Sequence, residues 1–413
     1  MAELLPFSGL RYAAGDGAAS GAVTDLSEVT APPYDVIDDD EHAMLERSHT
    51  QNAVRLILPR DSSARNRYEV AAETFATWRA DGVLAVDHQP SLYAYRMSFV
   101  DPGGRHRSTT GVIGALTLPE RPGTGDVLPH ERTLPKARSD RLALLRATRA
   151  NFDPIWGLSL AEGLTSAIGE FAPVMTAIDP GGARHELAPI VDAAALSSLC
   201  DLVREAPVVL ADGHHRFETA CAYRDEHSDR GSAAIMALVV ELAEPQLCVR
   251  PIHRLVAGLA FDAAALRGRL ATAFTVVDAG SNTPDAVRGL LERMDAEDAL
   301  GLVDHIGLAL LRPRSEVLDS RLAELPSALH DVDAARFDVG IKAELGDATL
   351  GYRDDAVTIA ALVEKHAIDA GILLRPVSVD QIRAAAFEGV RMPEKTTFFH
   401  PKPRTGMVFR TLD

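Results

Sequence analysis

The stretch from residue 206 to residue 220, Ala-Pro-Val-Val-Leu-Ala-Asp-Gly-His-His-Arg-Phe-Glu-Thr-Ala, constrains the fold more than any other part of the chain. Residues 208–211 form a short apolar run that is typical of a buried strand. The run ends at Asp212 and Gly213, and from His214 the apolar positions recur at helical spacing. A buried strand that turns directly into a helix is typical of an α/β protein, which is the fold class that we predict.

This turn carries polar side chains that packing alone does not require. Gly213 lets a ligand approach the backbone, and the start of a helix favours a negatively charged group. Arg216 offers a planar fork of donors for a phosphate or a carboxylate. A structural role is the alternative, because Asp-Gly is a common turn dipeptide and a histidine near a helix start is often only a cap. We expect Asp212, His214 and His215 to be catalytic, and Gly213 and Arg216 to bind phosphate.

Length and charge limit the class of protein. The chain has 413 residues, enough for two domains, which we expect at 1–257 (a core that carries the turn) and 258–413 (a C-terminal α/β region). The 42 basic and 59 acidic residues give a net charge of −17, which argues against nucleic-acid binding by the general surface. No apolar run approaches the ~20 residues of a membrane helix. The absence of a signal-peptide pattern and three widely spaced cysteines favour a cytoplasmic protein.

Hydrophobic periodicity predicts the elements that surround the turn. Residues 40–84 are mostly helical in pattern, and residues 91–99 and 107–118 alternate like two paired strands. We expect Ser139 to cap a helix, and residues 233–240 to form a strand that completes a βαβ unit with the turn. Further along the chain, helices are expected at 262–273, 284–295, 334–345, 355–368 and 380–387, and a brief strand at 372–374.

The C-terminal segment 391–410 reverses the charge balance of the chain. It contains five Lys or Arg residues and a single acid, Glu394, together with prolines that keep it extended. We expect this tail to return to the site, with Lys395, Lys402 and Arg404 binding phosphate. The alternative is a basic tail that only balances an acidic surface.

Two further segments place polar groups in rigid or extended chain. In His130-Glu131-Arg132, alternation along an extended segment puts Glu131 on the opposite side from its neighbours, where it could act as a general base. Surface ion pairing is the alternative for this segment. Tyr34 and Asp35 follow two prolines, and a rigid loop of this kind often shapes a pocket. We therefore expect Tyr34, Asp35, His130 and Arg132 to line the substrate pocket.

The sequence offers little for a zinc site. His214 and His215 are adjacent, so they cannot both face one ion from a regular helix. A Mg²⁺ ion held by Asp212 and by substrate phosphates is more plausible, because Mg²⁺ needs only one or two carboxylates. The phosphate-loop signature of P-loop NTPases and the Gly-x-Ser-x-Gly signature of α/β-hydrolases are both missing from the sequence.

Asp212-Gly213-His214-His215-Arg216, with Thr219 on the following helix, resembles the signature of the ParB/sulfiredoxin-like superfamily. Within it, the motif is most similar to that of free serine kinases, where it holds nucleotide phosphates and takes part in phosphoryl transfer to free L-serine. The resemblance implies a mixed-sheet core and adds Thr219 to the phosphate-binding residues. Those kinases use a glutamate base that has no matched position here. The loop at 31–35, the segment at 129–133 and the tail at 401–406 make the full chain resemble a large bacterial family of unknown function.

These observations lead to three hypotheses, in order. The first is a phosphotransferase with an alcohol group as acceptor, which uses ATP or ADP (or CTP) with Mg²⁺ and acts on a small metabolite, free L-serine being the first guess. The second, implied by the ParB branch, is a nucleotide-binding switch protein without metabolite turnover. The third is a metal-dependent hydrolase. We expect no nucleic-acid or membrane partner, and a homodimer is left open.

Overall fold

The computed structural model describes residues 2–13, 24–101, 103–121, 125–129, 136–227 and 229–412. The chain forms two compact units. The first contains Met1–Pro129, Thr133–Cys248 and Pro401–Asp413, and the second contains Val249–His400. The part of the C-terminal tail that begins at Pro401 therefore belongs to the first unit, whereas residues 391–400 of the tail belong to the second. Whether domains divide at residue 257 stays a prediction.

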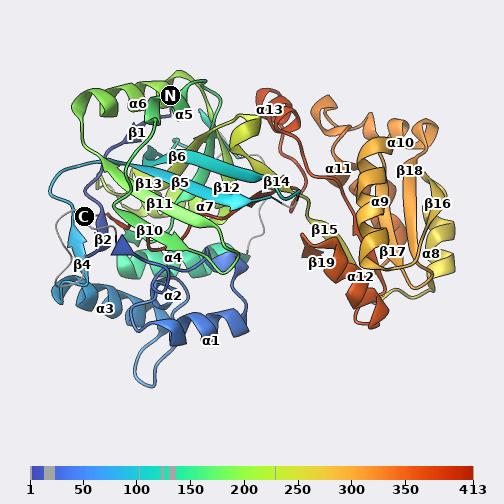
Figure 1. The fold of residues 1–413 in the computed structure, drawn as a ribbon, viewed down its shortest axis with the longest axis horizontal. Helices are drawn as coiled ribbons and strands as arrows, with labels where there is room; N and C mark the ends of the chain where they lie inside the picture. The colour runs from blue at the N-terminus through green and yellow to red at the C-terminus, as the bar shows by residue number, and fades with distance from the viewer. Residues whose placement is uncertain are drawn as a thin grey trace. The chain divides into compact units, whose positions relative to one another are not determined.

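A large mixed sheet forms the centre of the first unit (Figure 1). Among the described residues its strand order is β3-β10-β11-β5-β6-β13-β9-β12-β7, and β1 also pairs with β6. The bounds are β1 Leu4–Leu5, β3 Thr24–Asp25, β5 Leu92–Val100, β6 His106–Thr117, β7 Val127–Pro129, β9 Ile155–Ser159, β10 Met175–Ile178, β11 Arg184–Ile190, β12 Val208–Asp212 and β13 Ala234–Glu241. The predicted pair of strands is present as β5 and β6, which run antiparallel. The mixed α/β fold class is confirmed.

Helices cover both faces of this sheet. In Figure 1, α5 (Leu164–Ile168) and α6 (Ala193–Glu205) lie above the sheet, and α1 (Asp39–Ser48), α2 (Val54–Ile57), α3 (Arg67–Ala80) and α4 (Lys136–Thr148) lie below it. Because both faces are covered, β13 is buried along almost its whole length. This burial explains why its sequence is a continuous apolar run and does not alternate.

Three predicted details of these elements are wrong. The strand β12, the helix α7 (His214–Glu226) and β13 form no βαβ unit, because β12 pairs antiparallel with β9, and β9 lies between β12 and β13 and runs parallel to β13. An apolar run identifies a strand but not its neighbour, which depends on distant segments. Ser139 lies inside α4, which begins three positions earlier, at Lys136. The helix expected over 334–345 ends at Gly340, and a separate 3₁₀ turn follows.

Short strands tie the N- and C-terminal segments into the first unit. The strand β2 (Leu10–Tyr12) pairs with β4 (Leu84–Val86). The strand β22 (Arg410–Thr411) pairs with β8 (Ala150–Asn151). Both pairs are antiparallel. The backbone of Leu10 also exchanges hydrogen bonds with that of Phe409.

The second unit is a smaller α/β body with its own antiparallel sheet, in the order β16-β18-β17-β20-β15-β19. The strands are β15 His253–Ala257, β16 Phe274–Gly280, β17 Leu300–Asp304, β18 Leu308–Pro313, β19 Thr349–Arg353 and β20 Ala370–Leu373. The helices are α8 Ala263–Leu270, α9 Pro284–Glu297, α10 Ser315–Leu322, α11 Asp333–Gly340, α12 Ala356–Glu364 and α13 Val379–Phe387. Two further short strands, β14 (Cys248–Arg250) and β21 (Phe398–His400), pair with each other. Apolar side chains of α9 and α12 pack on β17, β18 and β20.

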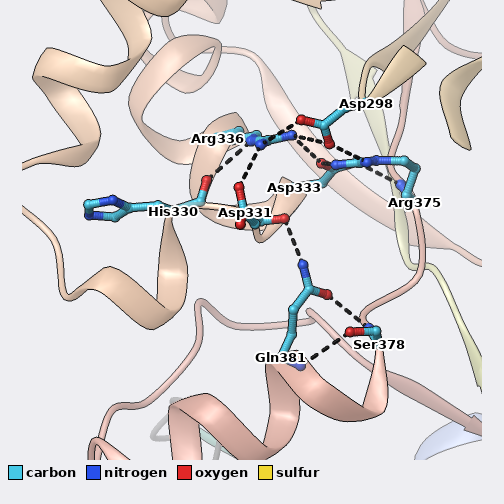
Figure 2. A network of polar contacts seen from close by, with 8 residues as sticks. All are labelled: Asp298, His330, Asp331, Asp333, Arg336, Arg375, Ser378 and Gln381. Carbon is cyan, nitrogen blue, oxygen red and sulfur yellow. Dashed lines mark hydrogen bonds and ion pairs between the residues drawn. The ribbon is translucent and has the colours of Figure 1, made fainter. Parts of the chain in front are cut away.

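A polar network inside this unit joins α11 to the segment between β20 and α13 (Figure 2). Asp333, at the first position of α11, accepts hydrogen bonds from the backbone and the guanidinium group of Arg375. Arg336 donates to both carboxylate oxygens of Asp298 at 3.0 Å. Asp333 and Arg336 are shielded from water, with side chains 2% and 7% exposed, whereas the Asp298 side chain is 62% exposed.

Within the described residues, no helix combines the length and apolar character that a membrane crossing would need.

Candidate functional site

The strand-to-helix turn is present as the sequence predicted. The strand β12 ends at Asp212, and α7 begins at His214. Gly213 between them has φ +86°, a conformation that favours glycine. A Cβ atom at this position would lie 2.8 Å from Ile155 Cγ2 and 3.0 Å from the Arg216 guanidinium group. The glycine is therefore required both for the backbone conformation and for the close approach of Arg216.

The helix α7 is held to the sheet by its buried face, which includes Phe217, Ala220 and Cys221, three of the residues at the helical spacing seen in the sequence. No side chain caps its N-terminus, because the cap position is Gly213. His214 and His215 occupy the first two helical positions and are half-buried. The first turn of α7 thus presents two imidazoles at the positive end of the helix dipole.

Arg216 is clamped by acceptors from two directions. Its NH1 group donates to the Asp153 carboxylate and, at 2.7 Å, to the carbonyl oxygen of Pro154. Its NH2 group donates to Asp212 Oδ2 at 3.0 Å. Burial lowers the pKa of Arg216, but the charges of Asp153 and Asp212 outweigh burial and raise it. Arg216 is therefore a fixed cation whose fork already holds two carboxylates.

Lys402, from the C-terminal tail, forms an ion pair with the other oxygen of Asp212. The two side chains are only 12% and 13% exposed, so water screens this pair weakly. Burial alone would raise the pKa of Asp212, but the charges of Lys402 and Arg216 lower it to about 2. The same carboxylate raises the pKa of Lys402 against the opposing effect of burial. Both groups stay charged across the physiological pH range.

The rigid loop that follows the two prolines lies close to this cluster. The Arg141 guanidinium group lies over the ring of Tyr34, 4.3 Å from the centroid of that ring. The charge of Asp35 raises the pKa of both Arg216 and Lys402, and burial raises the pKa of Tyr34 to about 12. The structure therefore brings the loop, the turn and the tail together, as segments separated by most of the chain.

A small cavity of about 50 Å³ lies beside Arg216. Its lining combines apolar side chains of α4 and α7 with Arg141, Asp153, Arg216 and Thr219. Thr219 Oγ1 and Arg216 Nε are buried without a hydrogen-bond partner among the described residues. A cavity of this size and polarity has room for a few ordered water molecules or one small polar group.

The remaining predicted residues are not placed beside Asp212 in the structure. Arg404 is buried in the first unit and donates from NH2 to the backbone oxygen of Thr30 at 2.8 Å. Lys395 belongs to the second unit, where its backbone oxygen accepts a hydrogen bond from Arg254. His130, Glu131 and Arg132 lie outside the described residues.

Sequence reasoning missed two members of the cluster, Asp153 and Arg141. Both reach the site through the fold: Arg141 lies in α4, and Asp153 follows β8 and precedes a proline. A carboxylate two residues after a short strand and directly before a proline is a weak signal for a site residue. No pattern in the sequence connects it to Arg216, 63 positions away.

Two cations next to the Asp212 carboxylate bear on its expected Mg²⁺ role. Both of its oxygens accept hydrogen bonds from cationic side chains, so a metal ion bound there would lie beside the positive charges of Lys402 and Arg216. Among the described residues, no group of three or more His, Cys, Asp or Glu side chains is arranged to hold a metal ion. The Mg²⁺ role of Asp212 stays a prediction.

Solved structures with partial similarity to this chain are known. A conserved hypothetical protein from Pyrococcus furiosus is 13% identical, with a TM-score of 0.36 over 70% of this chain and 92% of that chain. A free serine kinase in complex with AMP is 15% identical, with a TM-score of 0.34 over 66% and 83%. SbnI with a C-terminal truncation, from Staphylococcus aureus, is 11% identical, with a TM-score of 0.34 over 71% and 85%. At these TM-scores the similarities carry no weight in assigning a function.

Sequence comparison is more decisive about ancestry. No curated protein matches the chain significantly. The profile of one family matches residues 4–334, which is most of the chain and includes the whole of the turn and of α7. The chain therefore belongs to the DUF1015 family, which is described as a protein of unknown function.

Proposed function

We propose that this protein is a nucleotide-dependent kinase that transfers a phosphoryl group to a hydroxyl of a small metabolite. One observation carries the proposal: two cations with little exposure to water, Lys402 and Arg216, meet on Asp212 at the uncapped start of α7. Cations at a helix N-terminus form the usual setting for a phosphate group. Phosphoryl transfer asks the protein mainly for positioning and for neutralisation of charge.

Within this proposal Lys402 contacts the transferred phosphoryl group. An ammonium group has three N–H donors, so it can hold Asp212 and a phosphate oxygen at the same time. Arg216 has less freedom because its fork is engaged by Asp153 and Asp212. We therefore assign Arg216 to holding Asp212 and the charge balance of the site, with the first turn of α7 completing the phosphate contacts.

The acceptor hydroxyl needs a base, and Asp212 is poorly suited because its pKa is lowered to about 2. His214 or His215 would take the proton of the hydroxyl. The hydroxyl oxygen then bonds to the terminal phosphorus of the nucleotide while the bond from that phosphorus to the bridging oxygen breaks, and the shortened nucleotide leaves. Glu131 remains a second candidate for the base.

The resemblance of the motif to free serine kinases directs the choice of substrates to test. The purified protein is incubated with Mg²⁺, with ATP, ADP or CTP, and with L-serine or a pool of hydroxylated metabolites, and phosphorylated products are measured by mass spectrometry. We expect a product with the wild-type protein. Lys402→Gln should lower turnover by roughly 10²-fold, as expected for loss of a group that stabilises transition-state charge.

Lys365→Gln is the matched control, since Lys365 is exposed in the second unit. Turnover by Lys402→Gln at the wild-type rate would contradict the assignment of Lys402. Nucleotide binding by the wild type without any phosphorylated product would replace the kinase by the nucleotide-binding switch.

A further inference from the structure

The tail that carries Lys402 is an extended segment bound in the first unit. Thr405 exchanges backbone hydrogen bonds with Ala31, N–O 2.8 and 3.0 Å, and Arg404 donates to Thr30. Pro401 and Pro403 flank Lys402 and fix two backbone φ angles. Since a single stiff link separates Lys402 from Arg404, the position of one sets the position of the other.

A buried chain of hydrogen bonds ends on this link. The backbone N–H of Arg404 donates to the Tyr95 hydroxyl at 3.0 Å, and that hydroxyl lies 2.8 Å from His185 Nδ1. On the other side of the ring, His185 Nε2 lies 3.5 Å from Asp179 Oδ2. Tyr95 comes from the middle of β5 and His185 from the neighbouring strand β11, so the sheet itself holds the chain of groups in place.

The chemistry of these groups fixes the direction of each hydrogen bond. A carboxylate only accepts, so His185 Nε2 carries the hydrogen that faces Asp179. The neutral ring then accepts the Tyr95 hydrogen at Nδ1, and the Tyr95 oxygen is left to accept from Arg404. His185 is fully buried, and this burial lowers its pKa, in agreement with a neutral ring.

We propose that Tyr95, His185 and Asp179 are positioning residues that set the register of the tail and so hold the Lys402 ammonium on Asp212. In the part of the chain that the structure describes, the hydrogen bonds of Asp212 and Arg216 involve none of the three. Their effect passes through Arg404 and Pro403. The placement of Lys402 by these three residues does not depend on the proposed function. A role of that placement in phosphate binding does rest on the proposed function.

The chain offers a matched control on the same strand. Tyr93 lies two residues before Tyr95 on β5, is equally buried, and also accepts from one backbone N–H and donates to one side chain. Its partners are Gly9 N at 2.8 Å and Asp87 Oδ2 at 2.7 Å, which do not belong to the link between Arg404 and Lys402. Tyr95→Phe and Tyr93→Phe therefore remove similar hydrogen bonds, but only the first removes a bond to the tail.

The test measures Lys402 directly and needs no nucleotide. An amine-acylating reagent is applied to the full-length protein, and the labelling rates of Lys402 and of the exposed Lys365 are compared by mass spectrometry. In the wild type, the ion pair with Asp212 raises the pKa of Lys402 and slows its labelling. Tyr95→Phe should raise the ratio of the two rates roughly fivefold, the size expected for loss of one net hydrogen bond. Tyr93→Phe should leave the ratio unchanged.

Two further variants separate positioning from general loosening. His185→Asn retains an oxygen that can accept from Tyr95, whereas His185→Leu does not, so the leucine variant should show the larger rise in Lys402 labelling. Pro403→Gly should also raise the labelling of Lys402, although the hydrogen bonds of Tyr95, His185 and Asp179 remain, because the backbone between Lys402 and Arg404 becomes flexible. Equal ratios in Tyr95→Phe, Tyr93→Phe and the wild type would overturn the proposal.

ATP binding to the same variants distinguishes this proposal from the kinase. Suppose that Lys402 is labelled faster in Tyr95→Phe and that even the wild-type protein binds no nucleotide. This result supports the positioning role and contradicts the proposed function. Nucleotide turnover by the wild type, together with an unchanged labelling rate of Lys402 in Tyr95→Phe, supports the proposed function and overturns the positioning role.

Discussion

At the residue scale, the turn depends on one glycine that meets two separate demands. Gly213 has a positive φ, and it also lies against Ile155 and the Arg216 guanidinium group. Gly163 also has a positive φ, but it does not lie close to other side chains. It is also the N-cap of a helix, α5, with φ +91°, and a Cβ there would meet nothing within 4 Å.

We predict that Gly213→Ala destabilises the first unit more than Gly163→Ala does. Both variants incur the cost of a side chain in the left-handed region, roughly 1–2 kcal/mol. Only Gly213→Ala also forces Arg216 and Ile155 to shift, adding about 1–3 kcal/mol of overpacking. The measurement is the free energy of unfolding in urea, and equal losses in the two variants would show that Arg216 moves without cost.

A buried histidine makes the stability of the second unit depend on pH. Burial lowers the pKa of His253 to about 4, and its Nδ1 atom accepts a hydrogen bond from Leu374 N at 3.1 Å. The unfolded chain binds a proton near pH 6.5, so the unfolded state holds more protons between pH 6.5 and 4, and stability is lost as the pH falls through this window.

The expected loss from His253 is up to roughly 3 kcal/mol. In His253→Asn, whose amide oxygen can accept from Leu374, this part of the acid sensitivity should be missing. Hydrogen exchange of the amides in β15 and β20 at pH 7 and pH 4.5 measures it. A variant that loses protection at acid pH as strongly as the wild type would rule out His253 as the cause.

At the element scale, buried ion pairs decide how helices of the second unit are held. Asp333 in the first turn of α11 is buried with Arg375 and Arg336, whereas Asp380 in the first turn of α13 is 90% exposed with Arg383. The two aspartates occupy similar helix positions, and therefore differ mainly in burial. Removing one partner from a buried pair leaves an uncompensated charge, while an exposed pair contributes little.

Asp333→Asn should lower the free energy of unfolding of the second unit by about 3–5 kcal/mol. Asp380→Asn should change it by less than about 1 kcal/mol. Chemical denaturation followed by hydrogen exchange in α11 and α13 gives both values. A cost for Asp333→Asn as small as that for Asp380→Asn would mean that water screens the network in Figure 2.

At the scale of the whole molecule, the chain completes the first unit only with its last residues. The tail supplies Phe409 to a group of aromatic rings with Tyr12, Phe75 and Phe152. Arg410, which is buried, donates to Asn151 Oδ1 and to two backbone oxygens. The first unit is therefore assembled from both ends of the sequence.

We predict that a chain ending at His400 loses the fold of the first unit but retains that of the second. The truncation removes Phe409 from the aromatic group and removes hydrogen-bond donors to several backbone oxygens, among them those of Leu10 and Gly231, changes that cost several kcal/mol together. Hydrogen exchange along the full chain should show exposure of β5, β6 and β13 with protection of β17 and β20. Protection of both sheets would contradict an essential role for the tail.

How much of this could be predicted from the sequence varies with the range of the interactions. The turn at 212–216, the α/β class and most helices follow from local apolar spacing and from backbone preferences. The order of the strands does not, because β12 pairs with β9 through contacts between distant segments. The same holds for the start of α4, which lies earlier than its expected serine cap.

The composition of the site shows the same division. By itself the sequence determined that an acid, two imidazoles and a guanidinium group lie where a buried strand becomes a helix, because that depends only on neighbouring residues. Only the tertiary structure decided that Asp153 clamps Arg216 and that Lys402, 190 positions away, lies on Asp212. The physical reason is that ion pairs act through space at a few ångströms, and folding alone sets which distant residues meet.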